Sequence, residues 1–165
     1  MWNGLDVLVT GATGGIGRPL CEALRERGAR VIPFDRETCD LSSLAAVRDV
    51  PLPPVDVLIN NAGVGFGANQ TQREVSADGI ELRFAVNYLA PYSMTQRLLA
   101  RGLRAIVNVA SAGQRALDFD DLLTEEDYDG ITAYRRSKLA MIMWSFDLAE
   151  AQAVPVVSLH PGTFL

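Results

Sequence analysis

The chain has few of the side chains that most often carry chemistry at neutral pH. Fifteen of its 165 residues are lysine or arginine, yet Lys138 is the only lysine, and His160 is the only histidine. A single histidine excludes a Ser-His-Asp triad and zinc sites built from several histidines. Cys21 and Cys39 are too few for a disulfide framework or a thiolate metal site. The sequence therefore predicts no metal, and its cysteines are those of a reduced, cytoplasmic protein.

Charge and hydropathy exclude two further classes of partner. The formal net charge is −5 and there is no basic tract, which argues against a nucleic-acid partner or an anionic membrane surface. No apolar run reaches the roughly 20 residues of a membrane span, and the N-terminal residues lack the pattern of a signal peptide. Because 48% of the residues are hydrophobic, residues 1–165 are expected to form one globular domain with a substantial core.

The first segment predicts a turn that binds a dinucleotide. An apolar run at residues 5–9 leads into TGATGGIG at residues 10–17, and an amphipathic helix follows until Gly28. Strand, glycine turn and helix is the order that a dinucleotide fingerprint requires. The early glycines Gly11 and Gly15 permit a tight turn and close approach of a pyrophosphate, and Gly17 lets the helix pack against the strand.

The second predicted strand, residues 29–34, indicates the cofactor. Asp35 stands at its end, about twenty residues after the glycines. An acid there accepts hydrogen bonds from the adenosine ribose hydroxyls and repels a 2′-phosphate. Arg36 acts in the opposite sense, because a guanidinium can pair with that phosphate. We expect NAD as the cofactor and keep NADP as the alternative.

The rest of the chain alternates between strands and helices. Further strands are predicted at residues 39–41, 55–59, 105–110 and 154–159, and helices after residue 42 and over residues 76–100 and 134–152. Near-continuous apolar strands are typical of a parallel sheet that is covered on both faces. The sequence thus predicts an α/β fold, a Rossmann-type doubly wound parallel sheet of six strands in the order 3-2-1-4-5-6, with helices on both faces.

A proline interrupts the predicted helix over residues 76–100. Pro91 cannot donate a backbone hydrogen bond, so it frees the carbonyl of Asn87, four residues earlier. We therefore expect a disturbed helix beside a polar side chain that faces inward.

The only lysine follows Tyr134 by four residues. On a helix this spacing places both side chains on one face, one turn apart. An ammonium close to a phenol favours the phenolate, so Tyr134 could exchange a proton with an alcohol or carbonyl oxygen. Ser111 follows the strand at residues 105–110, at the sheet edge where open α/β folds bind ligands. The acidic segment at residues 118–129 is interpreted as a solvated loop rather than a metal site.

Taken in order, these motifs resemble those of the short-chain dehydrogenases/reductases over essentially the whole chain. The matching residues are Thr10-Gly11-x-x-x-Gly15-x-Gly17, Asp40-Leu41, Asn60-Asn61-Ala62-Gly63, Asn87, Ser111, Tyr134-x-x-x-Lys138 and Pro161-Gly162-Thr163. Residues 78–82, 86–89, 137–140 and 158–162 resemble the retinol-dehydrogenase-like branch. The glycine spacing Thr10-Gly11-x-x-Gly14-x-x-Gly17 also fits epimerases, whereas Asn60-Asn61-Ala62-Gly63 favours the dehydrogenases.

The resemblance implies a catalytic tetrad. Tyr134 would exchange the proton at the substrate oxygen, and Ser111 would position that oxygen. Lys138 would promote ionisation of the tyrosine and hold the nicotinamide ribose, and the carbonyl of Asn87 would anchor a water for proton relay. The reaction would move a hydride between C4 of the nicotinamide and an alcohol/carbonyl carbon of a small-molecule substrate.

The resemblance also implies the remaining cofactor contacts and a homodimer. Thr13 and Ile16 would belong to the phosphate turn, Asp40 and Leu41 would flank the adenine, Asn60, Asn61, Ala62 and Gly63 would line the adenosine side, and Pro161, Gly162 and Thr163 would border the nicotinamide. Family members continue after the last of these motifs with a substrate-covering region, which we expect to be missing here. Two alternatives stay open: a non-catalytic dinucleotide-binding regulator, and a nucleotide-sugar epimerase or dehydratase.

Overall fold

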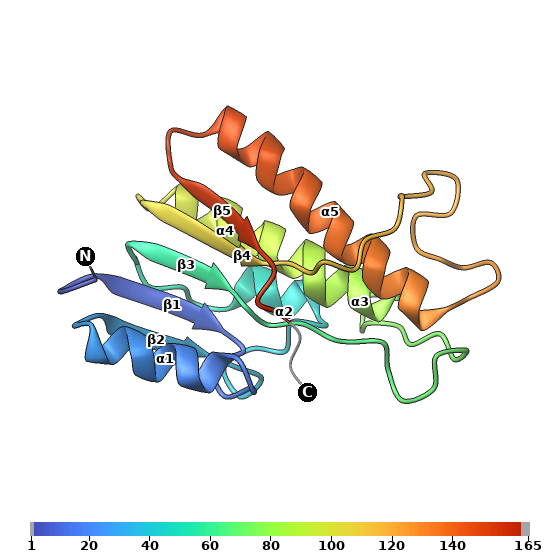
Figure 1. Ribbon diagram of the computed structural model, residues 1–165, viewed down its shortest axis with the longest axis horizontal. Helices are drawn as coiled ribbons and strands as arrows, with labels where there is room; N and C mark the ends of the chain where they lie inside the picture. The colour runs from blue at the N-terminus through green and yellow to red at the C-terminus, as the bar shows by residue number, and fades with distance from the viewer. Residues whose placement is uncertain (1, 163–165) are drawn as a thin grey trace.

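A computed structural model describes residues 2–162 of the chain as one parallel sheet with helices around it (Figure 1). The sheet has five strands in the order β2-β1-β3-β4-β5. The strands are β1 Asp6–Thr10, β2 Arg30–Phe34, β3 Val57–Asn60, β4 Ala105–Val109 and β5 Val156–Leu159. The helical segments are α1 Gly17–Glu26, α2 Leu44–Asp49, α3 Leu82–Phe84, η1 Ala85–Leu89, α4 Ala90–Leu99 and α5 Gly130–Ala151. The predicted doubly wound parallel sheet is confirmed.

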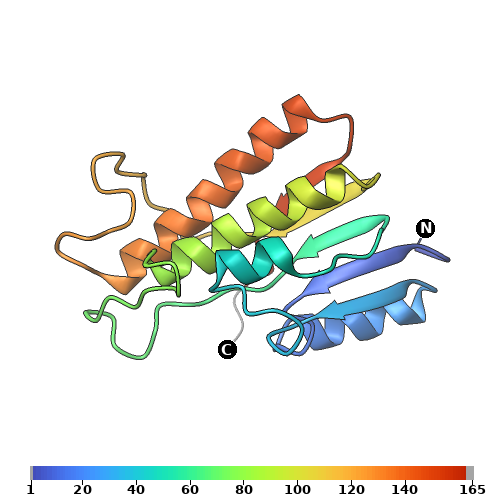
Figure 2. The same ribbon diagram turned by 180° about the vertical axis from the view of Figure 1, so that it is seen from behind.

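Helices cover both faces of the sheet (Figures 1 and 2). On one face, Val7 and Val9 of β1 pack with residues of α1. On the other, Leu8 lies in a core with residues of α2, α4 and α5. Successive strand residues point to opposite faces. Since both faces of the central strands are buried, nearly every position in them is apolar, as the sequence pattern indicated.

The strand predicted at residues 39–41 is absent, and this segment is a loop. The N–H groups of Thr38 and Cys39 donate to the carbonyl of Asp35, at 3.1 and 3.0 Å. The carboxylate of Asp40 accepts from the N–H and hydroxyl of Ser42, at 2.9 and 2.8 Å. These local turns use the polar groups that a strand would need for pairing with β2. The remaining five strands keep the predicted relative order.

The helix predicted from residue 76 begins only at Leu82. Ser76 instead closes a turn, because its N–H donates to the carbonyl of Ile80 at 2.7 Å and its hydroxyl accepts from Asp78 and Ile80 N–H at 3.2 Å each. Gly79 has a φ of +77°, a left-handed conformation that no helix interior accommodates. The turn therefore excludes an earlier helix start.

The disturbance predicted around Asn87 is confirmed. Ala85–Leu89 form a π-helical segment, and the N–H of Ala90 bonds to the carbonyl of Ala85, five residues earlier. Pro91 supplies no N–H for the carbonyl of Asn87. Wide turns of this kind are frequent at functional sites. Here the side chain of Asn87 is fully buried and faces the interior between the helices and the sheet.

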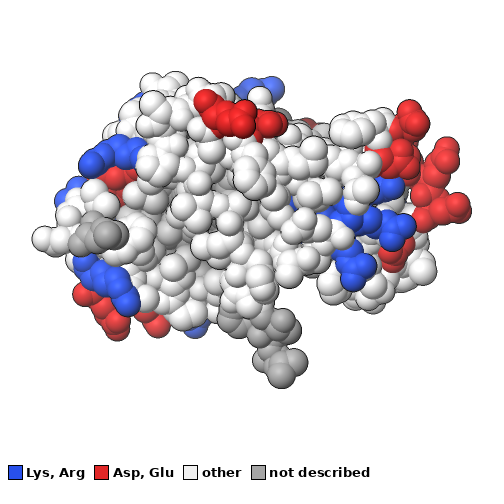
Figure 3. Space-filling view, turned by 45° about the horizontal axis from the view of Figure 1, so that its top comes forward, with Lys and Arg blue, Asp and Glu red and all other residues white. Residues whose placement is uncertain are grey.

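The surface and the helices give two further observations. Charged residues of both signs lie intermingled near the two ends of the face drawn in Figure 3, with a largely uncharged area between them. Among residues 2–162, no helix combines the length and the hydropathy that crossing a bilayer requires.

Candidate functional site

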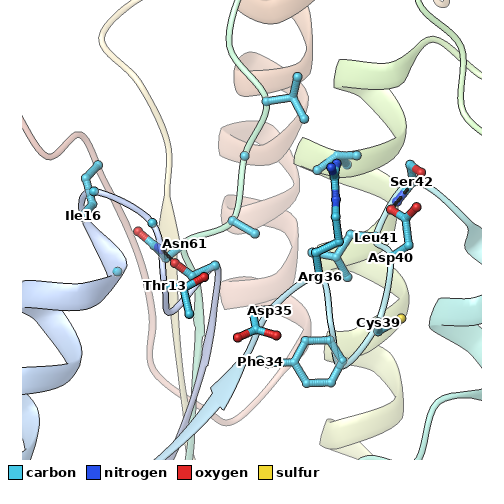
Figure 4. A pocket seen from close by; sticks show the side chains of 18 residues that line it. Thr13, Ile16, Phe34, Asp35, Arg36, Cys39, Asp40, Leu41, Ser42 and Asn61 are labelled. Carbon is cyan, nitrogen blue, oxygen red and sulfur yellow. Dashed lines mark hydrogen bonds between the residues drawn. The ribbon is translucent and has the colours of Figure 1, made fainter.

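A cleft of about 580 Å³ lies at the carboxyl ends of β1, β2 and β3 (Figure 4). This edge is where open parallel sheets bind ligands. The cleft brings together twelve of the predicted cofactor residues: Gly11, Thr13, Gly15, Ile16, Gly17, Asp35, Arg36, Asp40, Leu41, Asn61, Ala62 and Gly63. It adds six that were not predicted as cofactor contacts: Gly14, which the sequence named only in the epimerase-type spacing, and Phe34, Cys39, Ser42, Val64 and Val86. All six neighbour a motif residue, which is the only signal that could have found them.

The glycine turn is tight enough to require its glycines. A Cβ on Gly17 would lie 2.0 Å from the carbonyl oxygen of Gly11, and Gly11 itself has a φ of +64°. Ile16 precedes α1 and offers no side-chain hydrogen bond to its first turn. In this turn the N–H groups of Arg18 and Leu20 already donate to the carbonyls of Gly14 and Ile16, at 3.0 and 3.2 Å, and Pro19 has no N–H. The N–H of Gly17 therefore stays available to an anion in the cleft. These features fit the pyrophosphate of a dinucleotide.

Thr10 and Asn61 tie the glycine turn to the loop after β3. The Thr10 hydroxyl accepts from the N–H groups of Asn61 and Ala62, both at 3.0 Å. The Asn61 amide donates to the carbonyls of Thr10 and Gly11, at 2.9 and 3.1 Å. The side chain of Asn61 thus braces the wall of the cleft. The sequence placed Thr10 in the motif but did not reveal this role.

Asn60 does not line the cleft, contrary to the prediction. Its buried side-chain amide donates to the side-chain oxygen Oδ1 of Asn108 at 2.8 Å and to the hydroxyl of Thr95 at 3.4 Å. Asn108 in turn donates to the hydroxyl of Ser145 at 2.9 Å. Asn60 faces the sheet interior because the strand alternation directs it there. It therefore joins β3, β4 and α5 instead of contacting a ligand.

Asp35 and Arg36 leave the end of β2 in different directions (Figure 4). One carboxylate oxygen of Asp35 accepts from the N–H groups of Glu37 and Thr38, at 3.1 and 3.3 Å, so Asp35 also closes a turn. Arg36 extends toward Asp40. The pKa of Asp40 is lowered chiefly by its hydrogen bonds from Ser42 and further by the charge of Arg36.

Asn87 holds the loop after β3 through its side chain. Its amide oxygen accepts from the N–H of Val64 at 2.7 Å, and its amide nitrogen donates to the Val64 carbonyl at 3.0 Å. The same nitrogen donates to the hydroxyl of Ser137 at 3.0 Å. The family resemblance predicted a role for the backbone carbonyl of Asn87. It did not predict these hydrogen bonds of the Asn87 side chain.

Tyr134 and Lys138 lie on one face of α5. The Lys138 Nζ is 6.0 Å from the centroid of the Tyr134 ring and donates to the carbonyl of Val109 at 2.8 Å. Lys138 is 4% exposed, and this burial lowers its pKa to about 8. A Cβ on Gly63 would lie 3.4 Å from this Nζ and 3.3 Å from the Asn87 amide oxygen. Lys138 therefore reaches the end of the cleft that Gly63 lines.

Ser111 lies two residues beyond Val109, the residue that Lys138 contacts. Its hydroxyl accepts from the N–H of Gly113 at 3.1 Å. Gly113 is also flanked by Arg135, the neighbour of Tyr134, so Ser111 lies near the first turns of α5.

Two of the residues predicted to border the nicotinamide lie apart from the cleft. Pro161 and Gly162 follow β5 but do not line the cleft, and Thr163 falls outside the residues that the structure describes. Within residues 2–162, no three His, Cys, Asp or Glu side chains are grouped as a metal site requires.

Comparison with known proteins identifies the family. The model of the NAD dependent epimerase/dehydratase family matches residues 7–165. Retinol dehydrogenase 14 of Mus musculus is 34% identical over 210 residues, which cover 98% of this chain and 62% of the mouse protein. A short-chain dehydrogenase from Streptomyces avermitilis has a TM-score of 0.74 at 27% identity, covering 98% of this chain and 66% of that one. The chain belongs to the short-chain dehydrogenase/reductase family.

Within this family, the relatives also specify the branch. Several of the curated relatives are retinol dehydrogenases, as the sequence resemblance implied. The chain spans about three fifths of the length of the first of them. The 3-alpha-hydroxysteroid dehydrogenase from Pseudomonas sp. B-0831, complexed with NADH, has a TM-score of 0.73 at 26% identity, covering 96% of this chain and 72% of that one.

We expect the free energy of unfolding to rise with pH because of Lys138. The folded protein holds the proton of Lys138 less tightly than the unfolded chain, where the pKa of lysine is 10.5. The cost of burying the ammonium is therefore fully present below about pH 8 and is relieved as the pH rises toward 10.5. Between about pH 7 and about pH 9.5 the relief amounts to roughly 2 kcal/mol.

Denaturant unfolding of the wild type and of Lys138→Met at both pH values measures this effect. The unfolding free energy of the wild type, relative to that of Lys138→Met, should be larger at about pH 9.5 than at about pH 7. Arg135→Met, an exposed change on the same helix, serves as the control and should show a constant difference. A Lys138→Met difference that is independent of pH would contradict the burial argument.

Proposed function

We propose that this chain forms the dinucleotide-binding domain of an NAD(P)-dependent oxidoreductase that acts on an alcohol or carbonyl substrate. The observation that carries the proposal is the placement of Lys138 and Tyr134 on one face of α5, with the Lys138 ammonium next to Gly63 at the end of the cleft. The names of the relatives, retinol dehydrogenases and a hydroxysteroid dehydrogenase complexed with NADH, support the same reaction class.

The residues of the cleft fit a nicotinamide dinucleotide. The N–H of Gly17 and the glycine turn before it would hold the pyrophosphate, Asp35 the adenosine ribose, and Lys138 the nicotinamide ribose. When bound, the nicotinamide supplies the hydride chemistry that protein side chains lack. A carboxylate at the position of Asp35 would repel a 2′-phosphate on the adenosine ribose. This favours NAD over NADP.

Three side chains and one backbone carbonyl would take part in the proton transfer. Tyr134 gives a proton to the substrate oxygen in reduction and takes it back in oxidation. Ser111 donates a hydrogen bond to the same oxygen and orients it. Lys138 stabilises the phenolate, and its lowered pKa of about 8 lets it exchange protons near neutral pH. The carbonyl of Asn87, which Pro91 leaves without an N–H partner, would anchor the water that connects Lys138 with solvent.

A second candidate is a nucleotide-sugar epimerase or dehydratase, which the match to the epimerase/dehydratase family model favours. Such an enzyme uses the same Tyr134 and Lys138 pair but regenerates its cofactor in every cycle. NAD that remains tightly bound through purification, with no net production of NADH from any alcohol, would support this candidate over the first.

Tyr134→Phe should abolish turnover while leaving cofactor binding intact, because the change removes only the proton-exchanging hydroxyl. We expect the rate of NADH-dependent reduction to fall at least about 100-fold, a typical loss for a general acid. The assay uses retinal, decanal and cyclohexanone as substrates, and fluorescence titration gives the Kd of NADH, expected within about twofold of wild type. Tyr92→Phe, on the exposed side of α4, is the matched control. A fully active Tyr134→Phe protein would refute the assignment.

Asp35→Ala should weaken discrimination between NADH and NADPH. We expect wild type to bind NADH more tightly, and the variant to lose about tenfold in NADH affinity, because a charged hydrogen bond to the ribose is removed. Parallel titrations with both cofactors measure the ratio. Glu37→Ala, in the same turn, should leave the ratio unchanged. A wild type that prefers NADPH would mean that Arg36 dominates, and Arg36→Ala would then remove that preference.

We also propose that two copies associate through α4 and α5, as the family resemblance implies. Apolar side chains of these helices reach solvent: Tyr92, Met143 and Phe146, the last 69% exposed. Sedimentation velocity should find a dimer in wild type and a monomer in Phe146→Asp, because a carboxylate would be desolvated at the contact. Phe119→Asp, in the loop before α5, is the control. Monomeric wild type across the accessible concentration range would contradict the proposal.

A further inference from the structure

The loop after β3 carries an aromatic side chain to the candidate catalytic tyrosine. This loop and the first turns of α5 lie side by side (Figures 1 and 2). The ring of Phe66 meets the ring of Tyr134 edge to face, with centroids 4.9 Å apart and an interplanar angle of 84°. Phe66 is 42% exposed, so burial alone does not explain its position.

A buried arginine fixes the backbone that carries Phe66. Arg83 has no exposed surface, and its Nε and Nη2 donate to the carbonyls of Gly65 and Phe66, both at 3.0 Å. The remaining donors bond to Glu74 at 2.5 Å, Glu81 at 3.1 Å and Tyr128 at 2.8 Å. A guanidinium has five N–H groups, and all five are used here. Burial of a charge is tolerated only with such complete pairing.

The five hydrogen bonds of Arg83 are here called the Arg83 clamp. Its partners connect the loop to the helices of the site. Glu81, itself 1% exposed, accepts from the N–H of Phe84 at 2.8 Å and so caps α3, which leads into η1 and Asn87. Tyr128 lies two residues before α5. The loop is therefore held against both helical segments that supply residues to the site.

The first residue of α5 packs directly on the loop. The N–H of Gly130 donates to the carbonyl of Gln70 at 2.7 Å, and a Cβ on Gly130 would lie 2.4 Å from the carbonyl oxygen of Phe66. Asn87 holds Val64 from the other side. The backbone at residues 64–66 is thus fixed at three consecutive positions, one turn of helix away from Tyr134.

The orientation of the Tyr134 ring must be fixed by contacts other than hydrogen bonds of its own hydroxyl. Among the residues that the structure describes, none forms a hydrogen bond with its hydroxyl, and the Lys138 ammonium bonds to Val109. The direction of the phenol is therefore set by packing. We propose that Phe66 is a positioning residue for Tyr134, and that the Arg83 clamp exists to hold Phe66 in place. This inference rests on the proposed function, because it assumes that the Tyr134 hydroxyl is the proton donor.

The first test compares Phe66→Ala with Phe66→Tyr and with Phe119→Ala, a phenylalanine of the loop before α5 that is 78% exposed. With the aldehyde or ketone of the panel that wild type reduces, we expect kcat of Phe66→Ala to fall about tenfold, since small misplacements of a reacting group are costly. The Kd of NADH should stay within about twofold. Phe66→Tyr keeps the aromatic edge and should restore kcat, and Phe119→Ala should match wild type. A lowered Tm with unchanged kcat would overturn the proposal.

The second test does not depend on turnover. In protein labelled with ¹³C in the tyrosine rings, the Tyr134 signals are assigned by their loss in Tyr134→Phe. Phe66→Ala should move them toward the positions of a freely rotating tyrosine, and Phe119→Ala should not. Unchanged Tyr134 signals in Phe66→Ala would overturn the positioning role even in an active enzyme. If wild type reduces no substrate but the signals move as expected, the proposed function fails while the contact stands.

Discussion

The side-chain amide of Asn87 joins the two walls of the site, and the arrangement of the other residues depends on it. It binds both polar groups of the Val64 backbone and the hydroxyl of Ser137 on α5. Ser137 in turn donates to the carbonyl of Tyr134 at 2.7 Å. Asn87 lies within the π-helical segment before Pro91, so these hydrogen bonds form where the helix departs from regular geometry.

Buried polar side chains that form several hydrogen bonds recur around this joint. Arg83 holds the loop of residues 65–66, and the amides of Asn60 and Asn108 connect two neighbouring strands with Ser145 of α5. An apolar core tolerates small shifts, whereas a directional network loses several bonds when one partner moves. Placing such networks under the site therefore gives fixed positions to Tyr134 and Lys138, which both lie on α5.

Sequence motifs predicted those features of the structure that depend on residues close together in the chain. The glycine turn, Asp35 at the end of β2 and the break at Pro91 follow from backbone geometry within a few residues. The strand expected at residues 39–41 failed because the short polar side chains of Asp40 and Ser42 bond locally instead. The contact of Phe66 with Tyr134 could not be predicted, nor could the bond from Arg83 to Tyr128, since these partners are more than forty residues away in the chain.

The scarcity of lysine acquires a physical explanation at this site. Lys138 is buried against the Val109 carbonyl, and desolvation lowers its pKa to about 8, close enough to neutrality for it to give up and regain a proton. A guanidinium at this position would stay charged at any working pH. The other cationic side chains are arginines, including the buried Arg83, because a permanent positive charge is sufficient at those positions. Lys138, the only lysine in the sequence, occupies the buried position beside Tyr134.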